Sequence, residues 1–228
     1  MSRDQLIVAL DTRNVNQASH IVKCLEGSVN FYKIGLELAM NGGLDFAKEL
    51  ACSNYRVFLD MKLLDIENTV RKAVSNIADS GITFLSVHGM DSKTLNAAMQ
   101  GAKGSDLKIL SITVLTNLTR NDLVEQGLRE NSSTKVVAYR SEIAHRTGCH
   151  GAVSSGIEAS IIRKLTNPNF IIVTPGIRLP GNLMDDQERI TTPQTALLNG
   201  ANYIVVGRPI TQAKDIKASA ENFLKIIN

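Results

Sequence analysis

Short apolar runs alternate with amphipathic stretches along the whole chain. The apolar runs are bounded by polar corners and fall at residues 6–10, 30–35, 55–60, 83–88, 107–115, 151–155, 170–175 and 203–207. Between them, apolar residues recur at helical spacing over residues 15–26, 42–51, 67–80, 92–102, 134–147, 156–166, 192–199 and 211–227. The pattern therefore predicts eight strands, each followed by a helix.

Several of these strands are apolar at nearly every position, which is typical of a parallel sheet covered by helices. Eight repeats in 228 residues match the length of a compact α/β (β/α)₈ TIM barrel, and this is the fold we predict. An open doubly wound sheet would show the same alternation. Its dinucleotide-binding form needs G-x-G-x-x-G after the first strand, where this chain has LDTRNVNQ. No linker-like segment interrupts the pattern, so we expect one catalytic domain over residues 1–228.

Composition narrows the classes of function. The net charge is only +3, basic residues are scattered and Trp is absent, which argues against nucleic-acid binding. No apolar run approaches the roughly 18–20 residues of a membrane helix, and no signal-like segment precedes the first strand. Cys24, Cys52 and Cys149 are odd in number and far apart. They predict neither a disulfide framework nor a zinc site but buried or half-buried thiols in a cytoplasmic protein.

The unusual polar residues follow the predicted strands, where the active sites of barrels lie. The densest segment is FLDMKLLDIENTV at residues 58–70. Asp60 and Lys62 are two apart, so on an extended backbone their side chains point to the same side. Lys33 ends the neighbouring strand, about 4.8 Å away by sheet spacing. The alternative is a structural ion-pair network on the rim, but a whole cluster of charges at strand ends favours a functional site.

A second polar group follows the last two strands, in VTPGIR and VVGRP. Glycine allows close approach of the backbone to a ligand, and these loops commonly bind phosphate in barrels. Arg208 can hold phosphate oxygens through two bonds. Turn glycines with a solvated arginine are the alternative for either segment alone. The polar stretch 178–190 between them is a candidate lid, and 117–133 is either another lid or a connection.

The chain resembles the orotidine 5'-phosphate decarboxylases over nearly its full length. The matching stretches are VALD, YKIG, FLDMKLLDIENT, SVHG, TVLT, VTPGIR, DQERI and VVGRPIT. The pattern Asp-x-Lys-x-x-Asp-Ile-x-Asn-Thr is a specific signature. Departures from the family's usual form are Leu64 and Glu67, neither of which corresponds to a position that carries the chemistry.

The resemblance implies decarboxylation of orotidine 5'-monophosphate to UMP, the last step of de novo UMP synthesis, without metal or cofactor and in a homodimer. Lys62 resembles the lysine that protonates C6. Lys33, Asp60 and Asp65 resemble the rest of its charged array, with Asp65 reaching the partner subunit's site. The implied binding residues are Asp11 and Thr69 for ribose (Thr69 across the interface), Thr116 for the pyrimidine, Gln187, Gly207 and Arg208 for phosphate, Arg178 beside them, and Ile66.

Two rival functions are known or conceivable on the same barrel. Metal-dependent relatives on the same barrel act on phosphorylated sugars and carry a glutamate ligand at the end of the second strand, where this chain has Lys33. A lysine at that position would repel a metal ion. The other rival is a non-catalytic sensor of phosphorylated ligands. Such a protein would need a phosphate site but not the Lys62 and Asp60 array.

Overall fold

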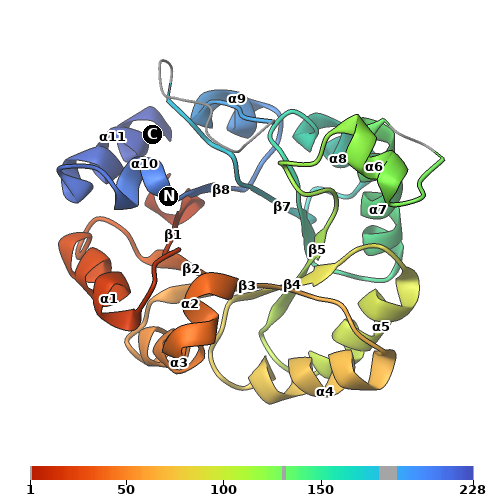
Figure 1. Cartoon of the computed structure of the whole chain (residues 1–228), viewed down its shortest axis with the longest axis horizontal. Coiled ribbons are helices and arrows are strands. Elements are labelled where there is room, and N and C mark those ends of the chain that lie inside the picture. The colour runs from red at the N-terminus through yellow and green to blue at the C-terminus, as the bar shows by residue number, and fades with distance from the viewer. Residues whose placement is uncertain (1, 130–131, 180–188, 228) are drawn as a thin grey trace.

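The computed structural model describes residues 2–129, 132–179 and 189–227, and its eight parallel strands close into a barrel (Figure 1). The strands are β1 (Leu6–Ala9), β2 (Phe31–Gly35), β3 (Arg56–Leu63), β4 (Phe84–His88), β5 (Lys108–Ile112), β6 (Gly151–Val153), β7 (Ile171–Thr174) and β8 (Tyr203–Val206). Each strand pairs with the next, and β1 pairs with β8. This closing pair rules out the open doubly wound sheet and confirms the predicted (β/α)₈ barrel.

Helices form a ring outside the strands (Figure 1). They are η1 (Ser2–Gln5), α1 (Val15–Cys24), α2 (Leu36–Leu38), η2 (Ala39–Gly43), α3 (Leu44–Cys52), α4 (Glu67–Ala78), α5 (Ser92–Gly101), α6 (Arg120–Glu125), α7 (Ser133–Arg146), α8 (Ala159–Leu165), α9 (Pro193–Leu198), α10 (Arg208–Thr211) and α11 (Ile216–Ile227). Every predicted helix is present. The last predicted helix, 211–227, begins with the end of α10 and continues as α11 after a break.

Alternate strand residues fill the barrel interior, as the period of a strand requires. This inner cluster contains Ile7, Ala9, Phe31, Phe58, Phe84, Leu110, Val173 and Val205. The ring centroid of Phe84 lies 5.2 Å from that of Phe31 and 6.1 Å from that of Phe58. At the N-terminal end of β3, the Arg56 guanidinium lies 4.2 Å from the Phe31 ring centroid. The N-terminal half of the barrel is therefore a packed core.

Three local features differ from the sequence-based expectations. The stretch 117–133 contains α6, which Thr119 and Asp122 begin with reciprocal side-chain to backbone hydrogen bonds. After β2, the chain forms α2 and η2, with a kink at Gly42. Cys149 is buried and Cys24 half-buried, but Cys52 is exposed because it ends α3 at the surface, so that expectation was wrong for Cys52. Within the described ranges, no helix is long and apolar enough to cross a membrane.

Candidate active site

A cavity of about 580 Å³ lies at the C-terminal ends of the strands. Its volume falls within the range typical of small-ligand sites. Residues predicted from the sequence to form the site and found lining this cavity are Asp11, Lys33, Asp60, Lys62, Thr116, Arg178, Gly207 and Arg208. The barrel therefore brings together residues that are far apart in the sequence, from Asp11 to Arg208.

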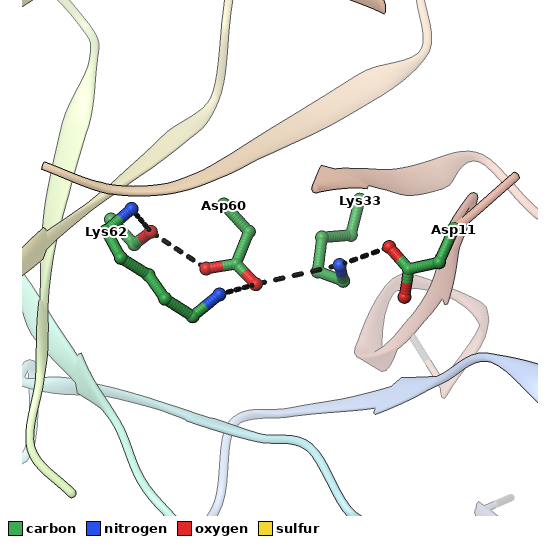
Figure 2. Close-up of polar contacts among 5 residues, drawn as sticks. Asp11, Lys33, Asp60 and Lys62 are labelled. Carbon is green, nitrogen blue, oxygen red and sulfur yellow. Dashed lines mark hydrogen bonds and ion pairs between the residues drawn. The ribbon is translucent and has the colours of Figure 1, made fainter. Parts of the chain in front are cut away.

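Four charged side chains form a row of alternating sign across one side of the cavity (Figure 2). Nζ of Lys33 lies 2.9 Å from Oδ1 of Asp11 and 3.6 Å from Oδ2 of Asp60. Nζ of Lys62 lies 2.8 Å from the same Oδ2 of Asp60. Gly35 makes room for this row, because a Cβ atom there would lie 2.8 Å from Oδ1 of Asp11 and 2.9 Å from Nζ of Lys33. A side chain at this position would disrupt the first ion pair.

The centre of the row is buried and its ends are more open to solvent. The side chains of Lys33 and Asp60 are 10% and 12% exposed, whereas those of Lys62 and Asp11 are 28% and 50% exposed. Burial lowers the pKa of Lys33, but the attraction of Asp11 and Asp60 outweighs it, so the pKa is raised. Burial raises the pKa of Asp60, but Lys33, Lys62 and hydrogen bonds outweigh it, so the pKa is lowered. Both groups therefore stay charged at neutral pH.

The backbone at Lys62 is not extended, contrary to the reasoning that placed its side chain beside Asp60. Its φ angle is +51°, in the left-handed region, and the pairing of β3 with β4 shifts register between Leu59 and Leu63. A bulge of this kind changes the direction of a side chain and is frequent beside active sites. The predicted proximity of Lys62 and Asp60 is present, but the bulge produces it rather than regular strand alternation.

Ser86 on β4 supports both residues and was missed in the sequence. Its hydroxyl donates a 2.8 Å hydrogen bond to Oδ1 of Asp60 and accepts one of 2.9 Å from the backbone N–H of Lys62. Ser86 is completely buried. A signal was available, because Phe84 faces the barrel interior and Ser86 is two residues further along the same strand.

Arginine and glycine residues line another part of the cavity, after β7 and β8. Gly176 has a φ of +75°, which favours glycine, and Arg178 two residues later is buried. Gly207 and Arg208 follow β8 directly. The side chain of an arginine here can bind an anion by charge and by two parallel hydrogen bonds. The cavity thus combines an alternating charge row with a cationic region.

The remaining predicted site residues are placed differently. Asp65, Ile66 and Thr69 follow β3 and are exposed, outside the set of residues that line this cavity. Oδ1 of Asp65 accepts a 2.6 Å hydrogen bond from the backbone N–H of Ile66. Gln187, together with most of the candidate lid 178–190, lies outside the described residues. Among residues 2–129, 132–179 and 189–227, no group of three or more His, Cys, Asp or Glu side chains is placed to hold a metal ion.

Comparisons with known proteins agree with the resemblance. A family model described as "Orotidine 5'-phosphate decarboxylase / HUMPS family" matches residues 4–223. A solved structure titled as the orotidine 5'-phosphate decarboxylase from Lactobacillus acidophilus is 36% identical and superposes with a TM-score of 0.86, over 99% of each chain. An uncharacterized conserved protein from Geobacillus kaustophilus is 28% identical, with a TM-score of 0.84, over 98% of this chain and 100% of its own.

Proposed function

The chain belongs to the orotidine 5'-phosphate decarboxylase / HUMPS family, and from this premise we propose that it converts orotidine 5'-monophosphate to UMP and carbon dioxide. This reaction is the last step of de novo UMP synthesis, and residues 1–228 act in it as one catalytic domain. The observation that carries the proposal is the row of Asp11, Lys33, Asp60 and Lys62 in a cavity that also contains arginines. The similarity to the Lactobacillus acidophilus enzyme supports the same substrate.

Lys62 is the proton donor in this proposal. When the bond between C6 and the carboxylate breaks, its electron pair stays on C6 in the plane of the ring, where the π system cannot delocalise it. A fixed positive charge stabilises such an anion most when it is oriented before the reaction. Asp60 and the bulge at Lys62 orient the Lys62 ammonium. The carbanion takes a proton from Nζ, and solvent restores the proton to the neutral amine.

Asp60 and Lys33 set the charge around that donor. Asp60 is held ionised by its two lysine neighbours and would lie near the substrate carboxylate. Repulsion between the two carboxylates is relieved as carbon dioxide leaves. Lys33 joins Asp60 to Asp11, and we assign Asp11 to the ribose hydroxyls.

The phosphate group binds away from the reacting carbon. We assign it to Gly207, Arg208 and Gln187, with Arg178 beside them. Binding energy from a remote group can be used to position the reacting group and to close the site. Variants of these residues should therefore lower kcat as well as raise KM for a substrate that carries phosphate.

The proposed reaction uses no metal or cofactor. Carboxylates that bind a divalent cation must be available to it, but Asp11 and Asp60 already have lysine partners within 4 Å. Those ammonium groups supply the positive charge that a metal would otherwise bring. The metal-dependent alternative in this fold requires an acidic ligand where this chain has Lys33.

We further propose a cytoplasmic homodimer in which Asp65, Ile66 and Thr69 complete the partner subunit's site. The support is the exposed apolar side chains of this segment: Leu64 and Ile66 are 52% and 73% exposed. An exposed apolar patch surrounded by polar residues is a common mark of an interface. A two-fold contact would complete two equivalent sites at once. The cytoplasmic assignment is supported by the three free thiols.

The experiment that tests the proposed function is an absorbance assay of orotidine 5'-monophosphate with purified protein in excess EDTA. Turnover to UMP supports the proposal together with its independence of metal. Turnover of orotidine 5'-monophosphate that appears only when a divalent cation is added would contradict the independence of metal, and binding without turnover favours the sensor.

A further inference from the structure

Arg189 connects three loops at the mouth of the cavity. Its Nη2 donates hydrogen bonds of 3.1 Å and 2.8 Å to the carbonyl oxygens of Val114 and Leu115. Its backbone N–H donates to the carbonyl oxygen of Thr116 at 3.3 Å. Val114, Leu115 and Thr116 all line the cavity, whereas Arg189 does not. Arg189 therefore contacts the outer side of the loop that follows β5.

Glu158 fixes the orientation of this guanidinium. Nη1 of Arg189 forms an ion pair with Oε1 of Glu158, and the hydroxyl of Ser155 donates to Oε2. The side chains of Arg189 and Glu158 are 12% and 2% exposed. A buried carboxylate is costly unless it has both a counter-charge and hydrogen bonds, and Glu158 has both. The pair therefore joins the loop after β6 to the loop after β5.

The residues after Arg189 are attached to the loop after β7. The backbone N–H of Thr191 donates to the carbonyl oxygen of Gly176 at 3.1 Å, and that of Arg178 donates to the carbonyl oxygen of Thr191 at 3.0 Å. Gly156 packs so closely on Thr191 that a Cβ atom there would collide with the threonine methyl group. The backbone of residues 189–191 is thus held on both sides.

We propose that Arg189 is a positioning residue for the pyrimidine end of the site, and that Glu158 is its anchor. By holding the carbonyl groups of Val114 and Leu115, Arg189 fixes the backbone that presents Thr116 to the base. This inference rests on the proposed function, which assigns Thr116 to the pyrimidine. Displacement of a positioned group by about 1 Å can lower a rate about 100-fold, so an indirect contact of this kind can matter to turnover.

The test compares Arg189→Lys with Arg163→Met. Arg163 is a matched control, because its guanidinium also binds backbone carbonyls, at Asn167, Phe170 and Gly200, but these loops precede β7 and β8 at the opposite end of the barrel. We expect Arg189→Lys to lower kcat/KM at least about tenfold. Arg163→Met should lower the melting temperature and leave kcat/KM unchanged. A change that removes only the Arg189 charge would strand the buried carboxylate of Glu158, so the variant without the guanidinium is Glu158→Met/Arg189→Met, which removes both charges and should lower kcat/KM at least as far.

Ligand binding separates this role from a merely structural one. Arg189→Lys should weaken the binding of UMP at least about tenfold and change the binding of ribose 5-phosphate by no more than about twofold. Ribose 5-phosphate lacks the base, and the base alone contacts Thr116. The effect of Arg189→Lys on kcat/KM should also shrink to about twofold in a Thr116→Ala background, as for residues that act as a unit. Equal weakening of both ligands, or full additivity with Thr116→Ala, would overturn the proposal.

A readout without substrate keeps this inference separable from the proposed function. Amide hydrogen exchange at residues 114–117 should be faster in Arg189→Lys than in wild type and unchanged in Arg163→Met. Unchanged exchange in Arg189→Lys would contradict the positioning role even if the protein decarboxylates orotidine 5'-monophosphate. Absence of turnover in wild type, with faster exchange in the variant, would refute the proposed function and leave the anchoring intact.

Discussion

The Ser86 hydroxyl donates a 2.8 Å hydrogen bond to Oδ1 of Asp60, on the carboxylate whose other oxygen binds Lys62. The same hydroxyl accepts a hydrogen bond from the backbone N–H of Lys62, where the chain has a left-handed conformation. One small side chain on β4 therefore supports both the Asp60 carboxylate and the backbone from which the Lys62 side chain projects. A hydrogen bond to a charged group contributes about 1.5–3 kcal/mol.

Ser86→Ala should lower kcat by about 10- to 150-fold, the equivalent of that hydrogen bond, while KM changes much less. The hydroxyl contacts the Asp60 carboxylate and the Lys62 backbone, and Ser86 is not itself among the residues that line the cavity. Ser111→Ala is the matched control, since Ser111 is also completely buried on the adjacent β5. Steady-state kinetics of both variants would check this, and equal losses of kcat in the two would contradict it.

Arg208→Ala should weaken ligands that carry phosphate and leave nucleosides unaffected. A charged hydrogen bond to phosphate is worth about 1.5–3 kcal/mol, or roughly 10- to 150-fold in affinity. Titration calorimetry with UMP and with uridine measures the difference within one variant. Equal loss for the two ligands would place the phosphate elsewhere.

The strand ends that carry Asp11, Lys33, Asp60 and Arg208 could be predicted because parallel strands direct their C-terminal residues to one end of a barrel. The bulge at Lys62 could not, because it depends on a tertiary hydrogen bond to Ser86, 24 residues away. The sequence pattern predicted the contact between Lys62 and Asp60 correctly. The reason for that prediction was an extended backbone, and the backbone is not extended at Lys62.

The ion pair between Glu158 and Arg189 also could not be predicted from the sequence. The two residues are 31 positions apart in the sequence and follow no periodic pattern. Their burial depends on how the loops after β5, β6 and β7 pack together. In contrast, helix α6 carried a local signal in Thr119 and Asp122, spaced as in a capping box, within a stretch interpreted as a lid or a connection.

The charge row predicts how stability depends on pH. The pKa of Asp60 is lowered, so its contribution is present above the unfolded-state pKa of about 3.9 and is lost as pH falls through the lower folded-state value. The pKa of Lys33 is raised, so its contribution is present below about 10.4 and is lost as pH rises through the higher folded-state value.

Between these limits, neither group should change the free energy of unfolding with pH. Urea denaturation of wild type and Asp60→Asn across pH gives the test. The stability of wild type relative to Asp60→Asn should be constant near neutrality and decrease in acid. A relative stability that changes between about pH 8 and pH 9, above the lowered pKa of the neighbouring His88, would mean that Asp60 is not held ionised by its lysine neighbours.

The proposed shared site predicts complementation between inactive subunits. Lys62→Ala and Asp65→Ala chains should each be inactive, but a mixed dimer has one site that combines an intact Lys62 with the partner's intact Asp65. With random pairing, about half of the dimers are mixed, so activity should return to about a quarter of wild type. No recovery despite proven subunit exchange would mean that Asp65 serves the site of its own chain.

The most direct test of Lys62 as the proton donor is the turnover of orotidine 5'-monophosphate by wild type and by Lys62→Ala, in parallel and in excess EDTA. Lys62 lies at one end of the charge row and is not part of the inner core cluster, so its replacement by alanine leaves the barrel core intact. Circular dichroism and melting temperature would verify that the variant is folded. We predict full turnover by wild type in EDTA and loss of nearly all turnover in Lys62→Ala. A folded Lys62→Ala variant that keeps a tenth or so of the wild-type kcat, a deficit of about 1.4 kcal/mol, would contradict the assignment of Lys62 as proton donor.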